Sequence, residues 1–320
     1  MAVNYNKPDR WKEDTALSVD MYNDWFMRFA PEAFRATREQ TAKEIQETFA
    51  ATRNLDDVGV ELLRAKPSVL PVLRMSTCPP LARDRLIGLA GVSGNLVDKM
   101  EKDNCLPPRM ARKDLDRDLR KIGEIIVRLA DPGLFVWLGR KKGPTEKELY
   151  RAATIVADRL CGAEANPIIR NAQEKRQLAA VGDWLSGANY RYVSSGEVTG
   201  IAEMTPGTFT FQLNVPIFQQ DAGKPIKLPV DAAVMPKMAR EGDFPLLIEA
   251  KSAGDFTNVN KRRKEEATKM KQLRANYGEG VRYVLFLCGY FDSGYLGYEA
   301  AEGIDWVWEH RIEDFREFGL

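Results

Sequence analysis

The chain has 320 residues, of which 44% are hydrophobic and 29% are charged, and its formal net charge is +1 at pH 7. This length and balance predict a soluble globular protein with one large core or two smaller ones, and they exclude a chain dominated by a basic tail. No stretch approaches the roughly 18 apolar residues of a membrane-spanning helix, and the N-terminal residues contain no apolar signal core. We therefore expect the protein in the cytoplasm and not in a membrane.

The first half of the chain is predicted to be helical. Between about residues 9 and 162, apolar residues recur at intervals of three and four, as they do within 21–29 and 115–129. Such stripes are typical of helix faces that pack into a core. We therefore expect residues 1–165 to form a helical region that is distinct from the rest of the chain.

Two local motifs stand out in this helical region. Thr145 and Glu148 have the spacing of a capping box, which predicts a helix that begins there and ends near Cys161. Residues 85–100 contain two short helical stretches around a turn at 91–93, a pattern typical of a DNA-binding helix-turn-helix. Two packed helices joined by a glycine turn give the same pattern, so both interpretations stay open.

After about residue 165 the pattern changes to a mixture of helices and strands. We predict helices at 171–185 and 259–277, and strands at 190–193, 208–215, 226–235, 244–251 and 281–288. This order predicts an α/β fold in which a mixed central sheet is flanked by helices. Residues 166–320 would form this second region.

The most informative motif is Glu249-Ala250-Lys251, at the end of the apolar run 244–248. Side chains alternate along a strand, so Glu249 and Lys251 would share one face. If the strand 226–235 pairs with it, Asp231 would lie alongside Glu249. Two neighbouring carboxylates suit Mg²⁺, which prefers oxygen ligands, and a nearby ammonium can orient a water molecule.

A solvated strand edge is the competing interpretation of this motif, because glutamate and lysine are common surface residues. Asp231 and Glu249, however, lie inside apolar runs and not in turns. A buried carboxylate is costly unless a metal ion, a cation or hydrogen bonds compensate its charge. This context favours a functional site.

Asp231, Glu249 and Lys251 resemble the Asp…(Asp/Glu)-x-Lys signature of the PD-(D/E)XK nucleases, and residues 249–266 resemble type II restriction endonucleases of the XamI kind. The similarity extends to 157–161, 168–178 and 11–35. One departure is that Val230 separates Pro229 from Asp231, where the signature has Pro-Asp; the ligand itself is retained.

The resemblance implies a catalytic core of the restriction-endonuclease type at 166–320, with the helical region at 1–165 serving DNA recognition, dimerisation or both. It implies Mg²⁺-dependent, sequence-specific hydrolysis of phosphodiester bonds in double-stranded DNA. Asp231 and Glu249 would hold Mg²⁺, with the Ala250 carbonyl as a further ligand, and Lys251 would position the attacking water. Glu174 is a candidate third acidic ligand, although a solvated helix face is an equally good interpretation of it.

The segment that follows Lys251 is the predicted DNA contact. Its polar side chains could reach base edges while its cations bind phosphates. Ion pairing with Glu265 and Glu266 on a solvated helix is the competing interpretation. The candidate residues are Ser252, Asp255, Thr257, Asn258, Asn260, Lys261, Arg262, Arg263 and Lys264.

The expected function is that of a type II restriction endonuclease. A double-strand break at a palindromic site would most simply need a homodimer, and a cognate DNA methyltransferase would be its genetic partner. Two alternatives stay open: a PD-(D/E)XK repair or junction-resolving nuclease, and a noncatalytic helix-turn-helix regulator. The single histidine, His310, excludes nuclease chemistries that need several histidines and is itself interpreted as a strand-end residue.

Overall fold

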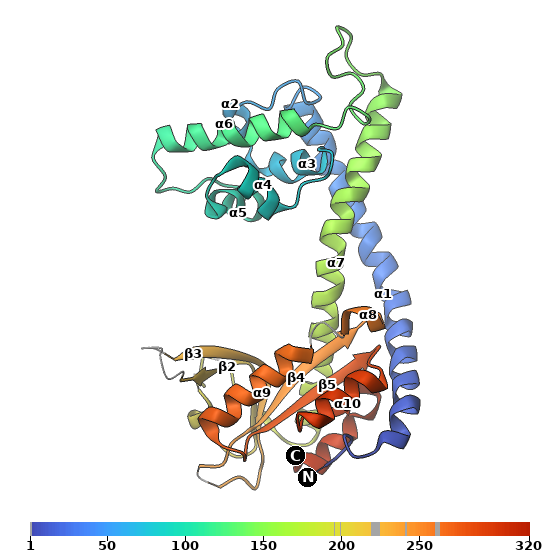
Figure 1. The fold of residues 1–320 in the computed structure, drawn as a ribbon, viewed down its shortest axis with the longest axis vertical. Helices are drawn as coiled ribbons and strands as arrows, with labels where there is room; N and C mark the ends of the chain where they lie inside the picture. The colour runs from blue at the N-terminus through green and yellow to red at the C-terminus, as the bar shows by residue number, and fades with distance from the viewer. Residues whose placement is uncertain (1, 195, 199, 219–224, 241, 260–262) are drawn as a thin grey trace. The chain divides into compact units, whose positions relative to one another are not determined.

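The computed structural model describes residues 2–194, 196–198, 200–218, 225–240, 242–259 and 263–320. The chain divides into two compact units, one made of residues 30–169 and the other of residues 1–29 together with 170–320. Two long helices, α1 (Pro8–Ala51) and α7 (Glu146–Gly187), each contribute residues to both units (Figure 1). Within the described residues, no helix is both long enough and apolar enough to cross a bilayer.

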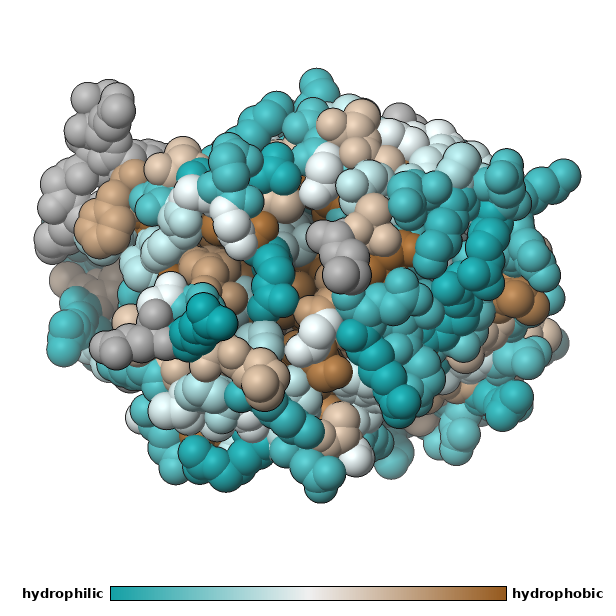
Figure 2. All heavy atoms as spheres, turned by 90° about the horizontal axis from the view of Figure 1, so that it is seen from below, coloured by the Kyte–Doolittle hydropathy of each residue, from teal (hydrophilic) through white to brown (hydrophobic). Residues whose placement is uncertain are grey.

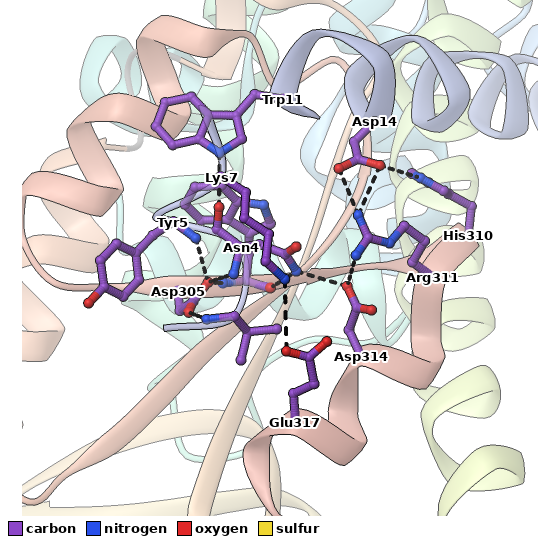
Figure 3. A network of polar contacts seen from close by, with 12 residues as sticks. Asn4, Tyr5, Lys7, Trp11, Asp14, Asp305, His310, Arg311, Asp314 and Glu317 are labelled. Carbon is purple, nitrogen blue, oxygen red and sulfur yellow. Dashed lines mark hydrogen bonds and ion pairs between the residues drawn. The ribbon is translucent and has the colours of Figure 1, made fainter. Parts of the chain in front are cut away.

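The first 29 residues pack with the C-terminal part of the chain, whereas the sequence pattern grouped them with the helical region at 1–165. The carboxylate of Asp305 accepts hydrogen bonds from the backbone amides of Val3 (2.6 Å) and Asn4 (2.9 Å). Further along, Asp14 binds Arg311 at 2.9 Å (Figure 3). These contacts join residues about 300 positions apart, so no local pattern could reveal them.

The unit formed by residues 30–169 is helical, as predicted. Leu119 and Ile122 are fully buried and Ile126 is nearly so, which confirms the expected core stripe on α6. The elements that lie wholly within this unit are α2 (Val60–Ala65), η1 (Pro67–Val69), α3 (Leu70–Met75), α4 (Arg83–Ala90), α5 (Gly94–Lys102) and α6 (Arg112–Leu129).

The two short helices and the turn predicted within residues 85–100 are present, an arrangement that both interpretations share. Helices α4 and α5 are joined by a turn in which Gly91 has φ = 60°, a left-handed conformation that glycine adopts without a Cβ penalty. Val92, in the same turn, is buried, so the turn also packs the two helices together.

The capping box at the start of α7 is confirmed. The Glu148 amide donates to Oγ1 of Thr145 at 3.3 Å, and the Thr145 amide donates to the Glu148 carboxylate at 2.8 Å. The helix does not end near Cys161, however, but continues through Pro167 to Gly187. A proline removes one helical hydrogen bond without ending a helix whose flanking turns are held by packing. The predicted boundary near residue 165 therefore falls inside α7.

The other unit contains a mixed six-stranded sheet in the order β1-β2-β3-β4-β5-β6, which confirms the predicted fold class. Strands β2, β3 and β4 are antiparallel neighbours, whereas β1 is parallel to β2, and β4, β5 and β6 are parallel to one another. The strands are β1 (Arg191–Tyr192), β2 (Thr208–Ile217), β3 (Ile226–Met235), β4 (Leu246–Ala253), β5 (Arg282–Gly289) and β6 (Asp305–Trp308).

Helices cover both faces of the sheet. On one face, Val181 of α7 packs with Ile248 of β4. On the other face, Met270 and Leu273 pack with Leu247 of β4. These last two helical residues belong to α9. The remaining elements of this unit are η2 (Ile201–Glu203), α8 (Phe256–Val259), α9 (Arg263–Tyr277), α10 (Ser293–Ala301) and η3 (Glu309–Phe318).

Candidate active site

Strand β3, which carries Asp231, pairs with β4, which carries Glu249 and Lys251, as the sequence predicted. Ala232 of β3 pairs with Ile248 of β4, so the next position places Asp231 opposite Glu249. The Asp231 carboxylate accepts a hydrogen bond from the Ala250 amide, with Oδ2 and N 2.8 Å apart. This bond ties the side chain of β3 to the backbone of β4 at the point where their regular ladder ends.

The neighbouring strand is distorted at the same level. Strand β2 pairs Phe211 with Ala232 and Leu213 with Val230, but these described strands do not pair Gln212 with Asp231. Gln212 has φ = 53°, which is uncommon outside glycine. Interruptions of this kind bend a strand and re-aim its side chains, and they are frequent next to functional sites.

Glu249 and Lys251 point to the same side of β4, and their side chains contact each other. Lys251 Nζ lies 3.0 Å from Glu249 Oε1. Because Leu247 packs towards α9, strand alternation sends Glu249 and Lys251 towards α9 as well. Glu249 is only 5% exposed, and its Oε2 has no hydrogen-bond partner among the described residues.

Two residues of α9 that the sequence reasoning did not assign to the site complete it. Lys269 Nζ lies 2.6 Å from Glu249 Oε1, and Lys251 Nζ lies 2.9 Å from Glu266 Oε1. Glu266 is fully buried, so the competing interpretation, in which it lies on a solvated helix face, does not hold for this residue. Its spacing of four and seven residues before Met270 and Leu273 is the signal that places it on the buried face.

The electrostatics of the site reflect this crowding of charges. Burial, followed by the negative charge of Glu249, raises the pKa of Asp231 to about 6, although the Ala250 amide and Lys251 counteract the rise. Burial would lower the pKa of Lys251, but the charges of Glu249 and Glu266 outweigh burial and raise that pKa above its ordinary value. A bound cation would stabilise the ionised form of Asp231 against these effects. Lys251 remains a protonated ammonium.

Glu174 lies on α7, where it is exposed, and its charge also contributes to the raised pKa of Asp231. The structure does not bring it into a ligand cluster: over the described ranges, no three His, Cys, Asp or Glu side chains are grouped as a metal site. Gln177, one turn further along α7, is buried and donates to the carbonyl oxygens of Lys251 and Phe286. That pair of hydrogen bonds fixes α7 against β4 and β5.

The predicted DNA-contact residues are distributed differently from the expectation. Ser252 belongs to β4 and not to the following loop, because the strand continues to Ala253. Asp255 accepts a hydrogen bond from the Thr257 amide at 2.8 Å at the start of α8, which occupies the predicted loop. Thr257 and Lys264 are exposed. Asn260, Lys261 and Arg262 lie outside the described residues, as do the side chains of Asn258 and Arg263.

His310 lies two residues past the end of β6, close to its predicted strand-end position. Its Nε2 is 3.5 Å from Oδ1 of Asp14, and burial lowers the pKa of His310 (Figure 3). Its neighbours in this network, Asp14 and Arg311, also join the N-terminal segment to the C-terminal part of the chain.

Two cavities lie apart from these carboxylates. One, of about 680 Å³, is lined by residues that include Met204, Phe244 and Tyr277, and the other, of about 610 Å³, includes Tyr5 and Leu246. Seen from below, hydrophobic side chains are recessed in a mainly hydrophilic surface (Figure 2). Neither of these two cavities is lined by the residues of the Glu-x-Lys motif.

A mixed sheet that carries Asp231 on one strand and Glu249-x-Lys251 on its neighbour defines the class of restriction-endonuclease-like nucleases. The model of the XamI restriction endonuclease family matches residues 53–308. The type II restriction enzyme SalI of Streptomyces albus G is 50% identical over 319 residues, which cover 99% of each chain. No solved structure matches the chain. The chain belongs to the XamI restriction endonuclease family, and it is a type II site-specific deoxyribonuclease.

Family membership confirms the expected function over its two alternatives, the repair or junction-resolving nuclease and the noncatalytic regulator. It also implies a divalent metal ion as cofactor. The matched range, 53–308, includes the three motif residues and part of the helical unit.

Proposed function

We propose that this enzyme hydrolyses DNA with Mg²⁺ held by Asp231 and Glu249. The observation that carries the proposal is the unpartnered Oε2 of Glu249, a buried carboxylate oxygen in a residue that stands opposite Asp231. An unmet acceptor in the protein interior is unfavourable, and a hard cation is a partner that suits two adjacent carboxylates. The Ala250 carbonyl and Glu174 are further candidate ligands in this proposal.

When bound, Mg²⁺ would polarise the scissile phosphate and make a coordinated water more acidic. Lys251 carries the complementary role. An ammonium has three N–H donors. The Lys251 ammonium donates a hydrogen bond to Glu249 and forms an ion pair with Glu266. A further donor would hold a water or a phosphate oxygen. Because its raised pKa keeps Lys251 protonated, it donates hydrogen bonds and does not serve as the base.

DNA binding is assigned to the segment from Ser252 to Lys264, which begins one residue after Lys251. Among the described residues of this segment, Thr257 and Lys264 are exposed and could contact the phosphates and bases of bound DNA. The helical region, with the α4–α5 motif, would add recognition, dimerisation or both.

A homodimer would supply the second active site that a double-strand break needs. Sedimentation of the free protein and of its complex with DNA tests this part of the proposal, and a monomer in both states would refute it. A cognate DNA methyltransferase would protect host DNA, and both enzymes would act in the cytoplasm, where that DNA lies.

The experiment that tests the proposed site compares D231A and K251A with K271A. Lys271 is a suitable control because its side chain is 70% exposed and lies on α9 outside the site. Purified proteins would cut plasmid DNA with Mg²⁺, and DNA binding would be measured with Ca²⁺ to confirm folding. We expect D231A and K251A to cut about 100-fold more slowly or worse, and K271A to cut normally.

Two results would contradict the assignment. If K251A cleaves DNA as fast as K271A, Lys251 does not take part in catalysis and the active site must involve other residues. Structure-dependent cutting of branched DNA without discrete plasmid fragments would favour a junction-resolving activity. Sequencing the fragment ends gives the recognition site and the stagger from the same samples.

A further inference from the structure

Glu266 is a fully buried carboxylate in a position that the proposed chemistry does not by itself require. A buried charge is costly unless it is paired and hydrogen-bonded. Glu266 has two partners: the Lys251 ammonium, with which it forms an ion pair at 2.9 Å, and the hydroxyl of Tyr283, which donates a hydrogen bond to its carboxylate. Tyr283 is itself only 4% exposed. The packing of α9 on β5 therefore holds the Glu266 carboxylate in contact with the Lys251 ammonium.

Lys251 needs such an anchor because its four-carbon stem has many rotamers. Glu249 is a poor anchor for it, because Glu249 Oε1 is shared between Lys251 and Lys269. In the proposed function Glu249 is also a ligand of Mg²⁺. Glu266 belongs to α9, and the hydroxyl of Tyr283 on β5 donates a hydrogen bond to its carboxylate.

We propose that Glu266, oriented by Tyr283, is a positioning residue that holds the Lys251 ammonium in its working place. This inference rests on the proposed function of Lys251. Glu266 touches neither DNA nor the reacting atoms in this scheme, and its effect on cleavage passes entirely through Lys251. A misplacement of about 1 Å in a reacting group costs about 100-fold in rate, so loss of the anchor should slow cleavage while leaving DNA binding intact.

The test uses E266Q, which keeps the shape of the side chain and removes its charge. Its matched control is E265Q, because Glu265 is the exposed neighbour on the same helix. DNA affinity would be measured with Ca²⁺, and cleavage would then be started with Mg²⁺ under single-turnover conditions. We expect E266Q to bind DNA like E265Q and to cut about 100-fold more slowly. E266D, which restores the charge, should recover part of the rate.

A double-mutant comparison separates positioning from general stability. If Glu266 acts through Lys251, K251A/E266Q should cut no more slowly than K251A alone. Y283F repeats the test with a smaller change and should also slow cleavage in the wild-type background but not in K251A.

Three outcomes would overturn the inference: an E266Q rate equal to that of E265Q, an undiminished rate in Y283F, or rate losses of E266Q and K251A that multiply. If E266Q does not fold, Y283F decides the question by the same two comparisons. A fully active K251A would instead overturn the proposed function, whereas a slow K251A beside a fast E266Q would overturn only the role of Glu266.

Discussion

The buried carboxyl group of Glu299 should make the stability of this unit depend on pH. It lies on α10 and is fully buried. Burial, followed by the negative charge of Glu266, raises its pKa from an ordinary 4.5 to about 8, and the Tyr295 hydroxyl offsets only part of the rise. At neutral pH, Glu299 is therefore mostly protonated in the folded protein and ionised in the unfolded chain.

The consequence for stability follows from proton linkage. Between pH 4.5 and about 8 the folded state binds more protons at Glu299 than the unfolded state, so the free energy of unfolding falls as pH rises. The slope is about 1.4 kcal/mol per pH unit, and the whole interval is worth about 5 kcal/mol. The favourable protonated contribution is complete below the unfolded pKa and is lost by the time pH has passed the folded pKa.

The variant E299Q removes this titration. We expect its free energy of unfolding, minus that of the wild type, to increase from pH 5 to pH 8 by about 4 kcal/mol and then to level off. Urea unfolding followed by tryptophan fluorescence can measure it, because Trp306 and Trp308 are fully buried in the same unit. The exposed-site variant E265Q provides the control. A difference between E299Q and wild type that does not change with pH would refute the reasoning.

Two further predictions concern the neighbourhood of the site. A Cβ at Gly289, where φ is 102°, would lie 2.1 Å from the Ala253 carbonyl oxygen. The variant G289A should therefore lower the free energy of unfolding by about 2–4 kcal/mol. An unchanged midpoint of urea unfolding would contradict this prediction. K269M removes a positive charge that lies 2.6 Å from the Glu249 carboxylate and repels a cation bound there. Because unit charges about 4 Å apart interact by about 1–4 kcal/mol, calorimetry should show that K269M binds Ca²⁺ at least about fivefold more tightly than the wild type. Weaker Ca²⁺ binding would count against Glu249 as a metal ligand.

The strands that carry the candidate site were predictable because their signals are local. The strand predicted at 226–235 has those bounds in the structure, and alternation placed Glu249 and Lys251 on one face. The mixed sheet followed from the order of elements along the chain. The strand bounds and the shared face of Glu249 and Lys251 used residues no more than about ten positions apart, whereas the sheet used the order of elements from about 171 to 288.

Other parts of the site depend on contacts between segments that only tertiary packing brings together. The spacing of Glu266 before Met270 and Leu273 indicates the buried face of α9, but the ion pairs of Glu266 and Lys269 are known only once α9 is packed on β4. The stripe from Met21 to Phe29 was expected to be core, but Phe26 is 37% exposed, and only Tyr22 of its aromatic members is buried. Which helix face is covered depends on tertiary packing, which periodicity alone does not specify.

The docking of the N-terminal segment also constrains the order in which the molecule can assemble during synthesis. Val3 and Asn4 bind Asp305, and Asp14 binds Arg311, so these contacts cannot form until almost the entire chain has been made. Residues 30–169 form a compact unit without that C-terminal part and can fold earlier. The DNA-cutting half is therefore the last to be completed, and a prematurely terminated chain would lack a finished nuclease inside the cell that makes it.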